Sequence, residues 1–124
     1  MDDLNSKKTL VLVASPKEDR YSNKALRMLM EHEVPVCAIA RRPGNVGEIE
    51  FLLGTPKIDN LHTITLYLNP FNQKDFYTYI ISLKPQRVIF NPGTENPDLQ
   101  NLLAENGIEY EEACTLVLLT TNQY

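Results

Sequence analysis

The sequence predicts an α/β fold in which a mostly parallel, doubly wound sheet carries helices on both faces. Apolar and β-branched runs of strand length alternate along the chain with segments of helical periodicity. The first run, residues 8–14, is continuously aliphatic, which is typical of a strand buried on both faces of a parallel sheet. The chain has 124 residues, fewer than the roughly 150 expected per domain. We therefore expect residues 1–124 to form one domain.

A strand, a helix and a second strand open the predicted fold. Residues 8–14 form the first strand, and Ser22 is the expected N-cap of a helix that ends near His32. Apolar residues recur in this helix at intervals of three and four: Ala25, Leu26, Leu29 and Met30. Residues 34–40 form the second strand, with Pro35 near its start, where a missing N–H is tolerated.

The second half of the chain repeats this alternation after an irregular connection. Residues 41–60 are rich in glycine and proline and have weak periodicity apart from a short apolar piece at 49–53, so we expect a loop there. Residues 63–68 alternate as a third strand, and residues 76–81 have helical spacing up to the stop at Lys84 and Pro85. Residues 87–90 form a short fourth strand.

The last predicted helix has both of its ends marked. Asn96 is a good N-cap, Pro97 suits the first turn, and Asn106 and Gly107 are a stop signal. Residues 108–110 and 115–119 are predicted as terminal strands. Right-handed crossovers between parallel strands then give an open, doubly wound sheet.

Charge and composition exclude several classes of partner. Twelve Lys and Arg against 16 Asp and Glu give a net charge of -4, so no global positive field attracts nucleic acid or an anionic membrane. Any bound anion must be held by local groups. No apolar run approaches the length of a membrane span and the first residues are acidic, so we expect a cytoplasmic protein.

The two cysteines, Cys37 and Cys114, each lie in an apolar stretch and far apart in sequence. This placement favours buried thiols in a reducing compartment over a disulfide framework. No CxxC, HExxH or Cys/His cluster occurs, so no metal site is predicted. A sharper hypothesis is a mixed disulfide between one of these cysteines and a thiol ligand, although buried cysteines are usually inert.

The loop after the first predicted strand is the first candidate binding segment, because ligands of doubly wound sheets bind at the carboxyl ends of the strands. A helix N-terminus that follows it offers free N–H groups and a positive dipole end, which suit a phosphate. The candidate residues combine small, cationic and short polar side chains: Ala14, Ser15, Pro16, Lys17, Arg20, Ser22 and Asn23. The alternative is a helix cap in a solvated loop, since no GxGxxG motif is present.

Three further loops follow predicted strands. Arg41 and Arg42 stand where dinucleotide-binding folds carry an acid for NAD, so they favour a phosphorylated ribose over NAD; the alternative is two solvated arginines. Leu68 and Asn69 follow the third strand. An elaborate loop after the fourth strand is a candidate binding wall, or only a helix entrance: Asn91, Pro92, Gly93, Thr94 and Glu95.

Several segments together resemble the small stand-alone CoA-binding domain proteins, which are similar to the CoA-binding domain of the succinyl-CoA synthetase α subunit. They are residues 12–16, 20–25, 65–70, 88–96 and 114–116, and the Asn-Pro-Gly-Thr-Glu-Asn loop is the most specific of them. The resemblance implies a Rossmann-like fold that binds coenzyme A at the strand carboxyl ends. By the resemblance, Ala14 to Pro16 lie along the diphosphate, and Arg20, Ser22 and Asn23 lie near it.

The resemblance also implies roles for the other loops. Arg41 or Arg42 faces the nucleotide end, Leu68 and Asn69 line the cleft, and the segment 93–95 flanks the pantetheine arm. The chain departs from many family members at Val13, where they have glycine, and at residues 40–41, where they have an asparagine-proline pair. The synthetase's catalytic phosphohistidine has no counterpart in this sequence.

The sequence contains no evident catalytic machinery. His32 and His62 are isolated and are interpreted as surface residues, and Glu95 has no visible partner as a general base. The predicted function is therefore binding of coenzyme A or a short acyl-CoA as a small-molecule ligand, with no catalytic residue. The alternatives are a protein-interaction domain with a vestigial nucleotide site, which Val13 motivates, and a CoA- or NADP-dependent enzyme, which a strongly shifted pKa in the cleft would favour.

Overall fold

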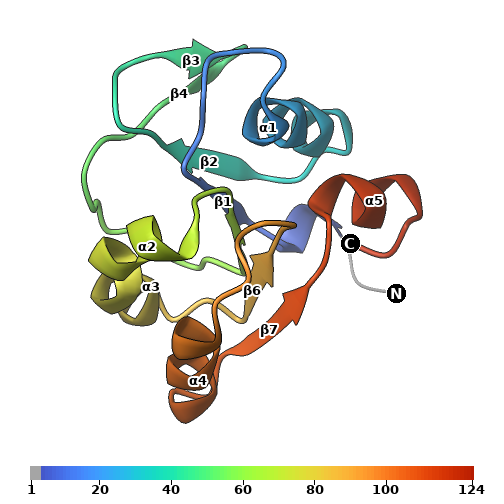
Figure 1. Cartoon of the computed structure of the whole chain (residues 1–124). Helices are drawn as coiled ribbons and strands as arrows, with labels where there is room; N and C mark the ends of the chain where they lie inside the picture. Colours follow the sequence, from blue (N-terminus) through green and yellow to red (C-terminus); the bar gives the residue numbers. More distant parts are fainter. Residues whose placement is uncertain (1–3) are drawn as a thin grey trace.

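The computed structural model describes residues 4–124 and is built on a five-stranded parallel sheet (Figure 1). The strands are β1 (Thr9–Leu12), β2 (Val36–Ile39), β5 (Thr63–Leu66), β6 (Arg87–Phe90) and β7 (Glu109–Glu112). They lie in the order β2-β1-β5-β6-β7, and each neighbouring pair is parallel. The predicted doubly wound, Rossmann-like α/β fold is thus confirmed.

Helices cover both faces of the sheet, as Figure 1 shows. The helical segments are η1 (Leu4–Ser6), α1 (Tyr21–Glu31), α2 (Pro70–Gln73), η2 (Lys74–Phe76), α3 (Tyr77–Leu83), α4 (Pro97–Glu105) and α5 (Thr115–Thr120). Alternate side chains of β1 point to opposite faces. Leu10 and Leu12 pack in one cluster with residues of α3 and α4, whereas Val11 packs in the other with residues of α1 and α5.

The sheet has its switch point at β1. The chain leaves β1 through α1 to reach β2 on one side, and later returns to pair β5 on the other side of β1. Because the connections depart in opposite directions there, a crevice opens at the carboxyl ends of β1 and β5. The fold therefore predicts a ligand site at the loops that follow these strands.

The connection predicted as a loop at residues 41–60 contains a small hairpin that the sequence analysis missed. Its strands are β3 (Asn45–Val46) and β4 (Ile49–Glu50), joined through Gly47 at φ +56°. Leu52 then forms an isolated parallel bridge with Ile39 at the outer edge of β2. Strands of two residues are too short to show a period of two in the sequence.

The predicted terminal strand at 115–119 is wrong, because this segment forms the helix α5. Its β-branched and aliphatic composition favours a strand, but the helix buries Thr115 and Leu119, which are four residues apart on one helical face. Leu119 joins the core cluster that contains the α1 residue Leu26. Tertiary packing here outweighs local propensity.

One of the two predicted helix caps is confirmed, and the other is wrong. Asn96 caps α4 as predicted, since its Oδ1 accepts a hydrogen bond from the Leu99 N–H at 3.3 Å. Ser22 does not cap α1: the N-cap is Arg20, in an extended conformation, and Ser22 lies inside the first turn. The helix begins earlier than the short polar residue that suggested its start.

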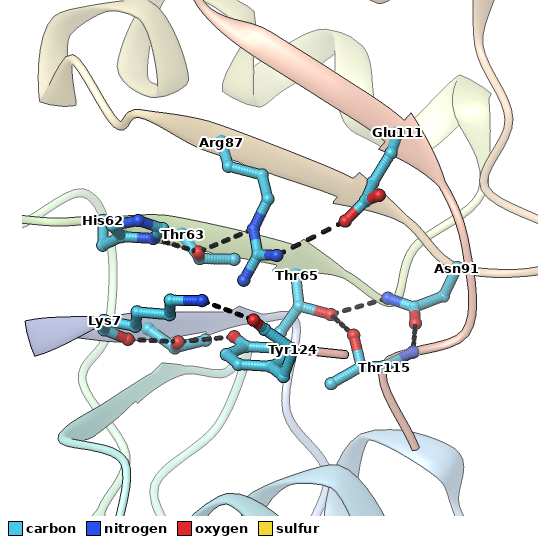
Figure 2. Close-up of polar contacts among 10 residues, drawn as sticks. Lys7, His62, Thr63, Thr65, Arg87, Asn91, Glu111, Thr115 and Tyr124 are labelled. Atoms are coloured by element: carbon cyan, nitrogen blue, oxygen red, sulfur yellow. Dashed lines mark hydrogen bonds and ion pairs between the residues drawn. The ribbon is translucent and has the colours of Figure 1, made fainter. Parts of the chain in front are cut away.

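A polar cluster lies on the sheet face opposite α3 and α4 (Figure 2). The Arg87 guanidinium stacks 4.5 Å from the ring centre of Tyr124 and donates to Thr63 Oγ1 at 3.1 Å. The Tyr124 hydroxyl and Thr9 Oγ1 are 2.6 Å apart. This cluster ties the segment after α5 to the start of the sheet.

Candidate functional site

A cavity of about 780 Å³ opens at the carboxyl ends of the strands. Residues that follow β1, β2, β5, β6 and β7 all contribute to its walls. The predicted site residues that line it are Ala14, Ser15, Lys17, Arg20, Ser22, Arg41, Leu68, Asn69, Asn91, Pro92, Gly93 and Thr94. The structure thus brings together segments that are far apart in the sequence.

One side of this cavity is cationic. Lys17, Arg20 and Arg41 line it, and none of the aspartates and glutamates in residues 4–124 does. Within residues 4–124 these three side chains form no salt bridge and no side-chain hydrogen bond. In a chain of net charge -4, a wall of unpaired cations without carboxylates attracts an anion locally.

The N-terminus of α1 faces the same side. The N-cap residue, Arg20, makes no side-chain capping hydrogen bond, so the N–H groups of the first turn are available to an anion. Ser22 lines the cavity although the residue is only 5% exposed. Its hydroxyl has no hydrogen-bond partner in the part of the chain that the structure describes. The first-turn N–H groups of α1 and the Ser22 hydroxyl are therefore both available to a ligand on the cationic side of the cavity.

Asn23, predicted near the phosphate, lies beneath the loop and does not line the cavity. Its Nδ2 donates to the Ser15 carbonyl at 3.0 Å, and its Oδ1 accepts from Arg27 Nε at 2.8 Å. Asn23 thus shapes the loop that carries Ser15 and Lys17. It is a positioning residue.

Three other predicted site residues also lie outside the cavity lining. Pro16 and Arg42 are exposed in the loops after β1 and β2. Glu95 Oε1 accepts a hydrogen bond from the Gly93 N–H at 2.9 Å and so shapes the turn in the loop after β6. Of the two adjacent arginines, only Arg41 reaches the cavity.

Asn91 lines the cavity, but its side-chain amide is committed to the fold (Figure 2). Its Nδ2 donates to Thr65 Oγ1 at 2.6 Å and to the Leu66 carbonyl at 2.9 Å. Its Oδ1 accepts from the Thr115 N–H at 2.9 Å. Asn91 therefore joins β5, β6 and α5 at the floor of the site.

Gln73 is a second positioning residue, and the sequence analysis missed it. It is fully buried, and its Nε2 donates to the carbonyls of Leu68 and Thr94 at 2.9 and 2.8 Å. Its Oε1 accepts from Asn96 Nδ2 at 2.9 Å. These bonds hold the loop after β6 against α2. No motif in the sequence marks a lone glutamine as such a residue.

Six lining residues were not among the predicted site residues: Val13, Tyr21, Tyr67, Asn72, Cys114 and Leu116. Val13 borders the cavity without closing it, so the feature that motivated a vestigial site leaves the space open. Cys114 could not be placed because the segment after it was predicted as a strand. Tyr67 was missed because the alternating pattern predicted a strand over residues 63–68, which assigned Tyr67 to the strand and not to the loop that follows it.

Tyr67 is the lining group whose pKa is most clearly altered. Burial raises the pKa of Tyr67 to about 12, and hydrogen bonds with the Thr65 and Thr115 hydroxyls offset part of this rise. Its hydroxyl therefore stays protonated at neutral pH and can donate a hydrogen bond to a ligand.

The histidines lie away from the site. His32 Nδ1 contacts the Met28 carbonyl and His62 Nδ1 contacts Thr63 Oγ1, and neither histidine lines the cavity. Both are half-buried. Residues 4–124 hold no group of three metal-ligating side chains. None of the helices described has the length and apolar character needed to cross a membrane.

Comparison with solved structures supports this architecture. A crystal structure of an uncharacterized protein matches with a TM-score of 0.93 and 46% sequence identity, over 95% of this chain and 98% of the other. A protein from Thermus thermophilus, cell-free ID.343, matches with a TM-score of 0.81 and 18% identity, over 95% and 90% of the two chains. A hypothetical protein from Pyrococcus horikoshii OT3 matches with a TM-score of 0.78 and 22% identity, over 90% and 80%. The last two show the fold alone.

Comparison at the level of sequence families is more specific. No curated protein matches the sequence. The model of the CoA binding domain family matches residues 7–120, a range that includes every strand of the sheet and every segment lining the cavity. With a parallel sheet, a site at its switch point and this match over nearly the whole sequence, the chain belongs to the CoA binding domain family.

Proposed function

We propose that the protein binds coenzyme A or a short acyl-CoA in the cavity at the carboxyl ends of its strands. The observation that carries this proposal is the cavity wall formed by Lys17, Arg20 and Arg41, to which residues 4–124 contribute no carboxylate and no salt-bridge partner. CoA has its phosphates at the nucleotide end and an uncharged pantetheine arm at the other. A cavity that is cationic on one side and mostly uncharged elsewhere matches that distribution.

The chemistry of the lining residues orients the ligand. The diphosphate pairs with the free first-turn N–H groups of α1 and with Arg20 and Lys17. Arg41, at the end of β2, pairs with the phosphate on the ribose. The pantetheine arm then runs past Leu68 and Gly93, toward the ends of β6 and β7.

A calorimetric titration with CoA, dephospho-CoA and NADP tests this proposal. We expect saturable binding of CoA that weakens when the ribose phosphate is removed. The substitution Arg41→Ala should weaken CoA binding by about tenfold, as expected for loss of one charge-assisted hydrogen bond worth about 1.5 kcal/mol. It should leave dephospho-CoA binding nearly unchanged.

The neighbouring residue supplies the matched control. Arg42→Ala removes the same charge from the next position, but Arg42 does not line the cavity. We expect CoA affinity to change by less than about twofold in this variant, since only long-range, screened electrostatics are lost. Equal losses in the two variants would contradict the assignment of Arg41. The absence of saturable binding of CoA, acyl-CoA and NADP would refute the proposal.

A CoA-dependent enzyme is the second candidate, and Tyr67 is the observation that favours it. The residue lines the cavity and its phenol is neutral, so it can supply a hydrogen-bond donor to the carbonyl oxygen of a thioester. Acyl-CoA turnover measured with wild-type protein and with Tyr67→Phe tests this alternative, and turnover that is lost in the variant would support it. We place the function in the cytoplasm, where unpaired cysteines such as Cys37 and Cys114 are typical.

A further inference from the structure

Tyr21 is an aromatic residue that is exposed at the cavity. It is the first residue of α1, and it is 67% exposed. Among the large hydrophobic side chains that are exposed in residues 4–124, Tyr21 is the one that lines the cavity. Because it contributes little to the core, a substitution at this position alters ligand contacts without unfolding the chain.

The ring of Tyr21 has a cation on one face. Lys24 Nζ lies over the ring, 5.2 Å from its centre, and Lys24 is three residues further along α1. A cation above one face of an aromatic ring is a stabilising contact that helps to hold an exposed ring in place. The opposite face is then the one on which a planar ligand group can stack.

Tyr21 adjoins the groups to which the proposed function assigns the phosphates. Its neighbour Arg20 and the more distant Arg41 both line the cationic side of the cavity. α1 packs on the same sheet face as β2, the strand that precedes Arg41, since Leu26 and Ala38 belong to one core cluster. In CoA a single ribose carries the base, the ribose phosphate and the diphosphate. A protein that holds both phosphate groups therefore keeps the base close to them, which favours the base over the pantetheine arm as the neighbour of Tyr21.

We propose that Tyr21 is a specificity-determining residue that stacks on the adenine base of CoA, while Lys24 supports the ring from its other face. This inference rests on the proposed function, because the phosphates must be held on the cationic side for the base to reach the ring. Purine bases stack on aromatic side chains through their π-faces. Tyr21 thereby selects ligands that carry a base, CoA and acyl-CoA, over phosphopantetheine, which lacks one.

Phe71 is the matched control in the same chain. It is 76% exposed, it lies at the start of the helix α2, and Lys74 Nζ lies 5.5 Å from the centre of its ring. Phe71 does not line the cavity. Tyr21 and Phe71 therefore share high exposure, a place at a helix start and a lysine three residues further on, and they differ in their access to a ligand in the cavity.

Calorimetric titration of three variants with CoA is the first test. Tyr21→Ala should weaken CoA binding about tenfold, within the range for base–aromatic stacking, whereas Phe71→Ala should change it by less than about twofold. Tyr21→Phe should restore most of the lost affinity, because it keeps the ring and lacks only the hydroxyl. Urea denaturation should give nearly the same midpoint for all three variants and the wild type, which separates loss of a ligand contact from loss of the fold.

A tryptophan reporter identifies the part of the ligand that meets the ring. The chain contains no tryptophan, so Tyr21→Trp and Phe71→Trp each introduce a single reporter. Because a stacked purine quenches indole fluorescence, we expect CoA to quench Tyr21→Trp, and we expect the same of the adenosine bisphosphate that forms the nucleotide half of CoA. Phosphopantetheine should leave this signal unchanged, and none of the three ligands should quench Phe71→Trp.

Three outcomes would overturn the inference. The first is an unchanged CoA affinity in Tyr21→Ala, and the second is an equal loss of affinity in Tyr21→Ala and Phe71→Ala. The third is quenching of Tyr21→Trp by phosphopantetheine that is as strong as quenching by the adenosine bisphosphate, since the ring would then contact the pantetheine arm. In all three cases CoA still binds the wild-type protein and the proposed function stands. A wild-type protein without saturable CoA binding would refute the proposed function, and this inference with it.

Discussion

Replacing Asn91 by alanine should destabilise the fold through two orphaned backbone groups. The Asn91 amide is the hydrogen-bond partner of the Leu66 carbonyl and of the Thr115 N–H, whereas Thr65 Oγ1 keeps a second partner in Thr115 Oγ1 at 2.8 Å. Each buried group left without a partner costs about 1–3 kcal/mol. Because Asn91 lines the cavity, water can reach part of the gap. We therefore expect a loss of about 2–4 kcal/mol in the free energy of unfolding.

Urea denaturation followed by circular dichroism measures this loss, and the denaturant dependence m should stay constant if only the folded state is affected. Asn72→Ala is the matched control, because Asn72 also lines the cavity but donates only its backbone N–H, to Asn69 Oδ1. It should cost less than about 0.5 kcal/mol, as for most surface substitutions. A loss below about 1 kcal/mol in Asn91→Ala would refute the reasoning that this amide holds β5, β6 and α5 together.

Three further predictions address the loops and the polar cluster. Gly93 has φ +91° and open space around the position that a Cβ would take, so Gly93→Ala should cost about 1–2 kcal/mol from backbone strain alone, measured by urea denaturation; an unchanged midpoint would contradict this. The pKa of Tyr67 is raised to about 12 in the folded state, so above its ordinary value of 10.0 the unfolded chain loses its proton first and stability falls as pH rises from 10 toward 12. Tyr67→Phe should reduce that fall in thermal melts, and an identical fall would contradict it. Tyr124→Phe removes the hydroxyl that faces Thr9 and should cost about 1 kcal/mol while keeping the ring stacked on Arg87, whereas Tyr124→Ala should cost clearly more in the same assay.

Local residue patterns predicted a helix or strand correctly where all the residues that determine it lie within one short segment. The β6 prediction matched the strand Arg87–Phe90, because a β-branched and aromatic run is bounded by Pro85 and the polar loop at 91–96. Asn96 and Pro97 placed the start of α4 for the same reason. Such signals failed at residues 115–119, where the choice between strand and helix depends on packing with a distant segment.

The candidate site, too, was predicted only in part from the sequence. Its loops were predicted because parallel strands place their carboxyl ends together, whatever the loops contain. The sequence alone does not show which side chain of a loop reaches the cavity. Arg41 and Arg42 are chemically identical neighbours, yet only Arg41 lines the cavity, and Glu95 forms a hydrogen bond within its own loop.

By itself, the sequence determined the alternation of strands and helices, the position of the candidate anion-binding loop and the family resemblance, because these depend on short-range patterns of apolar, turn and charged residues. Only the tertiary structure decided that α5 is a helix, that Gln73 and Asn91 hold the loops, and that Cys114 shares a cavity with Arg41. These features depend on contacts between residues far apart in the chain, and hydrogen-bond satisfaction and packing at such contacts are settled only when the whole sheet has formed.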